Sequence, residues 1–298
     1  MKIIIFGASG FLGTVLTNHL SRNHHITAVS RENSDLSGIP SNKNLTIQRL
    51  DTSKWSELIR EVKPDTVISA FWNGVAKGER AKEHVQLENI HLNKEIALIC
   101  KELQIDTFLA MGTQAEFRAS EFLIPELPSR NSSDFYGTVK RNLHYEMESL
   151  FAGSATRFVW ARVFSVYGPN DKSDSLVNGI VNAFKRNAVF YVNNPHRRWS
   201  FLYEEDFASA FSMIINNGSI DGIVNVGNPK LVRLGDISNL IGYPLIGSIN
   251  SQVDSNDGFY PITEKLDSNG WKPEFSFKKG FETTFSSYKE PSKGVLLE

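Results

Sequence analysis

Tyr136 and Lys140 are four positions apart, the spacing that places two side chains on the same face of a helix. A free tyrosine loses its proton near pH ~10, which is too high for acid or base chemistry at neutral pH. A lysine ammonium beside the phenol stabilises the phenolate and moves the pKa toward the working range. The pair therefore predicts a tyrosine that exchanges a proton with a bound substrate.

A second group of residues lies at the start of the chain, where the apolar run 2–6 is typical of a parallel strand buried on both faces. Gly7, Gly10 and Gly13 would allow a tight turn, close approach of a diphosphate and close packing of the next helix, respectively. That helix would direct its first amides at the phosphates. The predicted cofactor-binding residues of this loop are Gly7, Ser9, Gly10, Phe11, Leu12 and Gly13.

The Gly-x-x-Gly-x-x-Gly spacing together with Tyr-x-x-x-Lys resembles the short-chain dehydrogenase/reductase superfamily. The resemblance covers nearly the whole chain, and it implies that Thr113 hydrogen-bonds the reacting oxygen while Lys140 also binds the nicotinamide ribose. Four further stretches are similar to the extended branch, which acts mainly on nucleotide-linked sugars. They are Leu50-Asp51-Thr52, Met111-Gly112-Thr113, Arg162-Val-Phe-Ser-Val-Tyr-Gly-Pro169 and Phe201-Leu-Tyr-Glu-Glu-Asp206.

The end of the second predicted strand bears on the choice of cofactor. Enzymes that prefer NAD place a carboxylate there for the adenosine ribose, whereas this chain has Ser30 and Arg31. A hydroxyl and a guanidinium suit a 2′-phosphate, so we predict NADP(H), with NAD(H) as the alternative because Glu32 is adjacent. The resemblance adds further cofactor contacts at Asp51, Thr52, Ala70 and Phe71.

The residues after Thr113 bear on the reaction. Sugar-nucleotide 4,6-dehydratases resemble this chain but carry adjacent Asp and Glu there, whereas this chain has Gln114 and Ala115. Neither side chain can transfer a proton, so we expect no dehydration. Glu116 is a carboxylate one position away from the dehydratase pattern.

The substrate side is predicted from two segments. Ser165 occupies the position at which the family's Arg-x-Phe-Asn-x-Tyr-Gly-Pro segment has an asparagine that contacts the diphosphate. Arg197 and Arg198 precede Trp199, which falls at the position of a family arginine. Two arginines beside a tryptophan suit a diphosphate and a stacked base, or a solvated edge. The predicted substrate-binding residues are Thr113, Gln114, Ser165 and Arg198.

Several strands and helices must position these residues. Apolar strand-like runs alternate with helical patterns, which predicts an α/β fold with a doubly wound parallel sheet of the Rossmann type. Two long amphipathic helices are expected near 82–103 and 134–152. By resemblance this pair forms a homodimer interface, although both helices would also serve to cover the sheet. The strand-like runs are 2–6, 26–30, 45–50, 65–71, 106–112 and 157–164.

The resemblance also divides the chain into two parts. Residues 1–168 plus 200–228 are expected to form the NAD(P)-binding Rossmann domain. Residues 169–199 plus 229–298 are expected to form a smaller C-terminal substrate-binding lobe.

Composition excludes several classes of function. The 298 residues, 41% hydrophobic and 22% charged, are typical of a globular chain with a full core. The net charge of −1, without a basic cluster, argues against nucleic acid or an anionic membrane as partner. No apolar run reaches the roughly 18 residues of a membrane span, and we expect a cytoplasmic protein. The seven histidines show no compact ligand pattern, so we expect no metal.

These observations predict an NADPH-dependent reductase of a keto sugar carried on a nucleoside diphosphate, acting at C4 of a 4-keto-6-deoxy sugar. One alternative is a nucleotide-sugar 4-epimerase, which has the same residues but regenerates its cofactor in each turnover. Another is a regulatory protein that senses NADP without turnover. Such relatives often lack the Tyr or the Lys, and both are present here.

Overall fold

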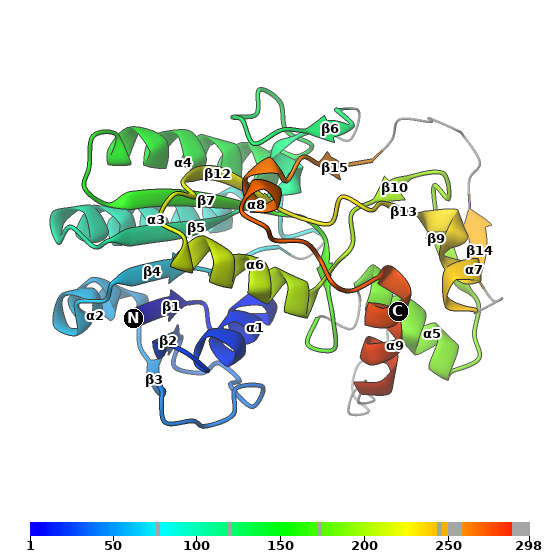
Figure 1. Ribbon diagram of the computed structural model, residues 1–298, viewed down its shortest axis with the longest axis horizontal. Coiled ribbons are helices and arrows are strands. Elements are labelled where there is room, and N and C mark those ends of the chain that lie inside the picture. Colours follow the sequence, from blue (N-terminus) through cyan, green and yellow to red (C-terminus); the bar gives the residue numbers. More distant parts are fainter. Residues whose placement is uncertain (76–77, 119–120, 172–174, 243–245, 250–257, 288–298) are drawn as a thin grey trace.

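A seven-stranded sheet forms the centre of the molecule (Figure 1). The structure is a computed structural model that describes residues 1–75, 78–118, 121–171, 175–242, 246–249 and 258–287. The strand order is β12-β7-β5-β4-β1-β2-β3, and every pairing is parallel. The strands are β1 (Lys2–Phe6), β2 (His25–Ser30), β3 (Leu45–Arg49), β4 (Thr66–Ser69), β5 (Thr107–Thr113), β7 (Arg157–Val163) and β12 (Gly222–Val226).

Helices cover both faces of the sheet, which confirms the predicted doubly wound architecture. One face carries α1 (Phe11–Leu20) and α6 (Glu204–Asn216). The other carries α2 (Trp55–Val62), α3 (Glu83–Glu102) and α4 (Phe135–Phe151). In β1, alternate side chains enter the two apolar layers: Ile3 and Ile5 face one, Ile4 and Phe6 the other.

The strand order reverses between β1 and β4. From β1 the chain builds β2 and β3 on one side, and α2 then returns it to β4 on the other side of β1. In such sheets the loops at the carboxyl ends of the two central strands border the ligand site. Here the two loops touch, because a Cβ added to Gly7 would lie 2.6 Å from the nitrogen of Phe71.

The other elements lie mostly beyond the carboxyl edge of the sheet, at the right of Figure 1. They pair as short ladders, and a third apolar cluster packs between them and the nearby helices. The ladders are β6 (Leu123–Ile124) with β15 (Tyr260–Pro261), β8 (Val166–Tyr167) with β11 (Leu202–Tyr203), β9 (Phe190–Asn193) with β14 (Ile246–Ile249), and β10 (Arg198–Trp199) with β13 (Val232–Arg233). The helices are α5 (Leu176–Lys185), α7 (Ile237–Ile241), α8 (Glu264–Ser268) and α9 (Phe277–Ser287), and the short 3₁₀ turns are η1 (Thr52–Lys54), η2 (Gln114–Glu116) and η3 (Leu234–Asp236).

Within the described ranges, none of the helices combines the length and the apolar character that crossing a membrane requires.

Candidate active site

The glycine turn between β1 and α1 has the geometry that its spacing predicts. Gly7 has a φ of 83°, a conformation that L side chains rarely adopt. A Cβ on Gly13 would lie 2.1 Å from the carbonyl oxygen of Gly7, so only glycine allows α1 this close to the strand. Gly10, by contrast, is exposed and begins α1 without a side-chain cap. The helix start is thus open to an anionic group.

The end of β2 offers a buried hydroxyl beside an exposed guanidinium. Ser30 is 2% exposed, and its Oγ has no hydrogen-bond partner among the described residues. Arg31 is exposed. Asp51 caps η1, where its Oδ1 accepts from the nitrogen of Ser53 at 3.0 Å, and this backbone hydrogen bond lowers the pKa of Asp51. Thr52, the next residue, is half-buried. The glycine turn and the unpaired Ser30 hydroxyl both fit a dinucleotide.

Aromatic residues follow β4, after the half-buried Ala70. The Phe71 ring packs edge-on against Trp55 in the core, with ring centroids 5.0 Å apart, so its backbone rather than its ring borders the glycine turn. The next ring, that of Trp72, lies beside Lys140 and Tyr136. Lys140 Nζ lies 3.6 Å from its centroid, in a cation–π contact.

Thr113, Tyr136 and Lys140 come together where α4 packs on the end of β5. Lys140 Nζ donates to the carbonyl oxygen of Met111 at 2.7 Å, and a side-chain hydrogen bond joins Thr113 to Tyr136. Gly137 permits this packing, because a Cβ there would lie 1.9 Å from the carbonyl oxygen of Ala115. The three residues predicted as catalytic therefore form one cluster.

Burial shifts the pKa values of both α4 residues away from their ordinary ranges. It raises the pKa of Tyr136 to about 12, against the effects of Arg80 and of the Thr113 hydrogen bond. It lowers the pKa of Lys140 to about 7, although the charge of Glu116 acts in the opposite direction. In each case the neutral form is favoured because the charged form has lost its water.

Glu116 is a structural residue. It is 1% exposed, and its Oε2 accepts from Arg162 Nε at 3.0 Å. Its Oε1 accepts from the nitrogen of Thr113 at 2.7 Å and from Trp160 Nε1 at 3.0 Å. All these donors fix the carboxylate beneath the end of β5, so it is not free to serve as the acid or base of an elimination. The sequence signal for this role is the capping-box spacing from Thr113 to Glu116.

Three of the four predicted substrate-binding residues lie together. Gln114 Nε2 donates to Ser165 Oγ at 3.2 Å, and Trp199 Nε1 also donates to this hydroxyl. Gln114 follows Thr113 directly, so these side chains adjoin the catalytic cluster. Arg198 is exposed, and it precedes Trp199 on β10, where successive side chains point to opposite faces.

Arg197, which was not among the predicted site residues, directly precedes β10 and lies against the Trp199 ring. Its Cζ is 5.4 Å from the centre of the Trp199 ring. The pair of arginines in the sequence was the available signal, but it did not indicate which of the two would face the tryptophan.

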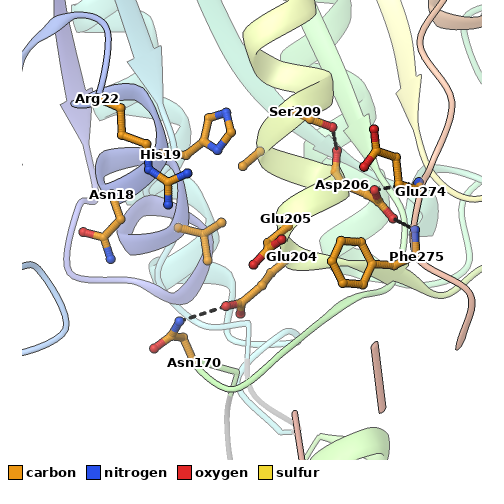
Figure 2. A pocket seen from close by; sticks show the side chains of 12 residues that line it. Asn18, His19, Arg22, Asn170, Glu204, Glu205, Asp206, Ser209, Glu274 and Phe275 are labelled. Carbon is orange, nitrogen blue, oxygen red and sulfur yellow. Dashed lines mark hydrogen bonds between the residues drawn. The ribbon is translucent and has the colours of Figure 1, made fainter. Parts of the chain in front are cut away.

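A cavity of about 380 Å³ lies between α1 and α6, and none of the predicted site residues lines it (Figure 2). Its floor includes Glu204, whose Oε1 accepts from Asn170 Nδ2 at 3.0 Å. A Cβ on Gly168 would lie 2.1 Å from Glu204 Oε2, so the carboxyl packs directly against this glycine. Burial raises the pKa of Glu204 to about 7.

Several known proteins are similar to this chain. CDP-abequose synthase of Salmonella typhimurium is 21% identical over 302 residues, which cover 94% of this chain and 96% of that protein. dTDP-D-glucose 4,6-dehydratase of Dictyostelium discoideum is 20% identical, over 97% of this chain and 81% of that protein. The solved structure of UDP-glucose 4-epimerase from Thermotoga maritima with UDP-glucose superposes with a TM-score of 0.82 at 16% identity, over 96% of this chain and 98% of that one.

The structural likeness establishes the fold, and the family is established by a separate match. The sequence model described as the NAD dependent epimerase/dehydratase family matches residues 3–227, well over half of the chain. This range contains the glycine turn, Thr113 and the Tyr136–Lys140 pair. The chain is therefore an enzyme of the short-chain dehydrogenase/reductase type and belongs to the NAD dependent epimerase/dehydratase family.

Proposed function

We propose that this enzyme is an NADPH-dependent reductase of a nucleoside-diphosphate-linked keto sugar, acting at C4 of a 4-keto-6-deoxy sugar. One observation carries the proposal: Thr113, Tyr136 and Lys140 form a cluster suited to hydride transfer, and among the described residues the nearby carboxylates of Glu116 and Asp134 are both engaged by other groups. Gln114 and Ala115 follow Thr113, and the carboxylate of Glu116 is engaged by Arg162. Proton donation to a carbonyl oxygen needs only the tyrosine, whereas elimination of water needs a further acid and base.

The similar proteins support the substrate class. CDP-abequose synthase and dTDP-D-glucose 4,6-dehydratase are both named for sugars linked to a nucleoside diphosphate. Each alignment covers more than nine-tenths of this chain, including the segments around Ser165 and Trp199. We therefore place the diphosphate near these residues, with Arg197 as a cation beside Trp199.

The residues of this chain divide the work of the proposed reaction. When bound, a nicotinamide cofactor supplies the hydride that reduces the carbonyl carbon. Thr113 orients the carbonyl oxygen, and Tyr136 donates its phenolic proton to it. Lys140 binds the nicotinamide ribose, and its contact with the carbonyl oxygen of Met111 fixes the side chain in the site. The open helix start at Gly10 binds the diphosphate of the cofactor.

We propose NADP(H) as the preferred cofactor. The support is the Ser30 hydroxyl, buried and unpaired in the described structure, together with the exposed Arg31 beside it. A 2′-phosphate would accept hydrogen bonds from both groups.

We also propose the division of the chain that the sequence predicts. Residues 1–168 plus 200–228 form the domain that binds the cofactor, and residues 169–199 plus 229–298 form the lobe that binds the substrate. An apolar cluster beyond the sheet supports it, with Val177, Ile180, Leu234 and Phe281 among its members. Tyr167, Phe201 and Tyr203 of the first part also join this cluster, and Leu266 and Trp271 of the second part pack in the core beside the sheet. Residues 172–174, 243–245, 250–257 and 288–298 of the second part lie outside the described residues.

We further propose that two copies pair through α3 and α4, as in a two-fold dimer. The support is the set of large apolar side chains that these helices expose, Leu87 at 51%, Leu98 at 53% and Tyr145 at 41%.

The function is tested with purified protein, NADPH and a panel of 4-keto-6-deoxy sugars on different nucleoside diphosphates, by following the absorbance of NADPH. We expect loss of NADPH with at least one member of the panel. Tyr136→Phe is the matched control: we expect turnover to fall at least about a hundredfold while affinity for NADPH stays nearly unchanged. Near-normal turnover in this variant would remove Tyr136 from the mechanism.

A further inference from the structure

Tyr136 lies in surroundings in which a negative charge is costly. Its side chain is 7% exposed, and the Trp72 ring lies edge-on to it with ring centroids 5.9 Å apart. Donating a proton leaves a phenolate at this buried position, which burial disfavours. A cation beside the ring would offset this cost.

Lys140 directs its ammonium elsewhere. Its Nζ donates to the carbonyl oxygen of Met111 at 2.7 Å and lies 3.6 Å from the centre of the Trp72 ring. Burial lowers the pKa of Lys140 to about 7, which disfavours the charged form of this side chain. The lysine therefore supplies the phenol with only part of the charge that the motif predicts.

Arg80 brings a second cation to the tyrosine. Its Cζ is 4.9 Å from the centre of the Tyr136 ring. Its Nε donates to the carbonyl oxygen of Val75 at 3.0 Å, and its Nη1 is 3.6 Å from Asp134 Oδ2. Asp134 in turn caps α4, because its Oδ1 accepts from the nitrogen of Gly137 at 2.7 Å. The guanidinium thus lies beside the helix turn that carries the tyrosine, although its side chain is 47% exposed.

The charged groups around Tyr136 act on its pKa in both directions. Burial raises the pKa, Arg80 and then Thr113 lower it, and the carboxylates of Glu116 and Asp134 raise it. Arg80 is the cation that acts on the tyrosine most strongly.

We propose that Arg80 is a positioning residue of the reaction centre, which fixes Tyr136 and stabilises the negative charge that this side chain carries after donating its proton. The inference rests on the proposed reductase function. In that reaction the phenol O–H bond breaks while a new O–H bond forms on the reduced carbonyl oxygen, so the negative charge passes from that oxygen to Tyr136. A guanidinium over the ring attracts this charge.

The kinetic test compares Arg80→Gln with Arg80→Lys and with Lys82→Gln, which removes an exposed cation two residues away that pairs with Glu79. In the oxidative direction the phenolate is the base, so activity rises with pH. We expect Arg80→Gln to move this rise upward by about one pH unit and to lower kcat about tenfold. We expect Arg80→Lys to restore most of the native pH dependence and most of the native kcat, and Lys82→Gln to change neither quantity. A raised KM with unchanged kcat and pH profile would overturn the inference in favour of simple substrate binding.

A second readout needs no substrate, so it separates a failure of this inference from a failure of the proposed function. After a rapid pH jump, tyrosinate absorbance is recorded for the native protein and for Arg80→Gln, each with and without Tyr136→Phe. The difference within each pair reports the ionisation of Tyr136. We expect less tyrosinate in the Arg80→Gln pair at the same alkaline pH, because its pKa is higher without the guanidinium. Equal ionisation in both pairs would overturn the inference even if the enzyme proves not to be a reductase.

Discussion

Ser30 and Arg31, at the end of β2, are the residues on which the proposed choice of cofactor depends. The Ser30 hydroxyl is buried without a partner in the described structure, and an unpaired buried donor is costly unless a ligand satisfies it. Arg31 is exposed and carries a positive charge at the same strand end. Both features suit the 2′-phosphate of NADPH better than a bare ribose.

We predict that NADPH binds more tightly than NADH and that Arg31→Asp reverses this order. The new carboxylate repels the 2′-phosphate and accepts hydrogen bonds from a ribose hydroxyl. Titration of the intrinsic fluorescence of each dinucleotide gives both affinities. Arg22→Asp, in the loop before β2 and so at the opposite end of this strand from Arg31, serves as the charge-matched control and is expected to leave the order unchanged. Equal affinities for the two dinucleotides in the native protein would contradict the prediction.

Single residues were predictable from the sequence where a local motif encodes them. Gly7 is required by its own positive φ, Gly13 is required by its contact with Gly7 six positions earlier, and Tyr136 and Lys140 share one helix face. Arg80 is different. It lies between β4 and α3, whereas Tyr136 lies on α4, so the two residues meet only when the folded chain brings these segments together. No spacing in the sequence reports such a contact.

At the scale of elements, the start of α6 contains a buried carboxyl that the proposed chemistry does not use. Glu204 is the first residue of the helix and packs against Gly168, and burial raises its pKa to about 7 from an ordinary value of 4.5. The folded protein therefore binds this proton more tightly than the unfolded chain does. The resulting stabilisation is complete below about pH 4.5 and is lost as the pH rises through about 7.

We predict that Glu204→Gln raises the free energy of unfolding by about 1–3 kcal/mol at pH ~8 and has little effect at pH ~4.5. The amide resembles the protonated acid and keeps an oxygen that can accept from Asn170. Urea denaturation at the two pH values measures the difference. Glu205→Gln, at the adjacent exposed position, is expected to change stability by less than about 0.5 kcal/mol. An equal gain at both pH values would show that titration of Glu204 is not the cause.

Most of the sheet strands were predictable because they are buried on both faces. The edge strand β3 was predicted although it is largely exposed, and β12 was not among the predicted runs. A continuous apolar run follows from such burial, and each predicted strand lies within two residues of the observed one. The two-residue strands such as β8, β10 and β13 have no such signal, since two residues carry no periodicity. The geometry around Ser165 and Trp199 depends on these short strands, which is why the sequence did not distinguish Arg197 from Arg198.

At the scale of the whole molecule, the proposed dimer makes a direct prediction about mass in solution. Lys94 and Glu146 form an ion pair that joins α3 to α4, and Leu98 lies one turn further along α3. We expect light scattering to give the mass of two chains for the native protein and of one chain for Leu98→Glu, because a buried charge opposes pairing. Leu240→Glu alters an apolar residue of similar exposure on α7 and is expected to leave the dimer intact. A native protein with the mass of one chain would contradict the proposed dimer.

If this enzyme consumes NADPH to reduce a keto sugar at C4, a labelled hydride must pass from the cofactor to C4 of the sugar. The protein is incubated with NADPH that carries deuterium at both C4 positions of the nicotinamide and with the 4-keto-6-deoxy nucleotide sugar that gave turnover. We expect one deuterium at C4 of the product for each NADPH oxidised, as seen by mass spectrometry and by NMR. Interconversion of 4-hydroxy epimers without loss of NADPH and without label in the product would contradict this expectation and would identify a 4-epimerase.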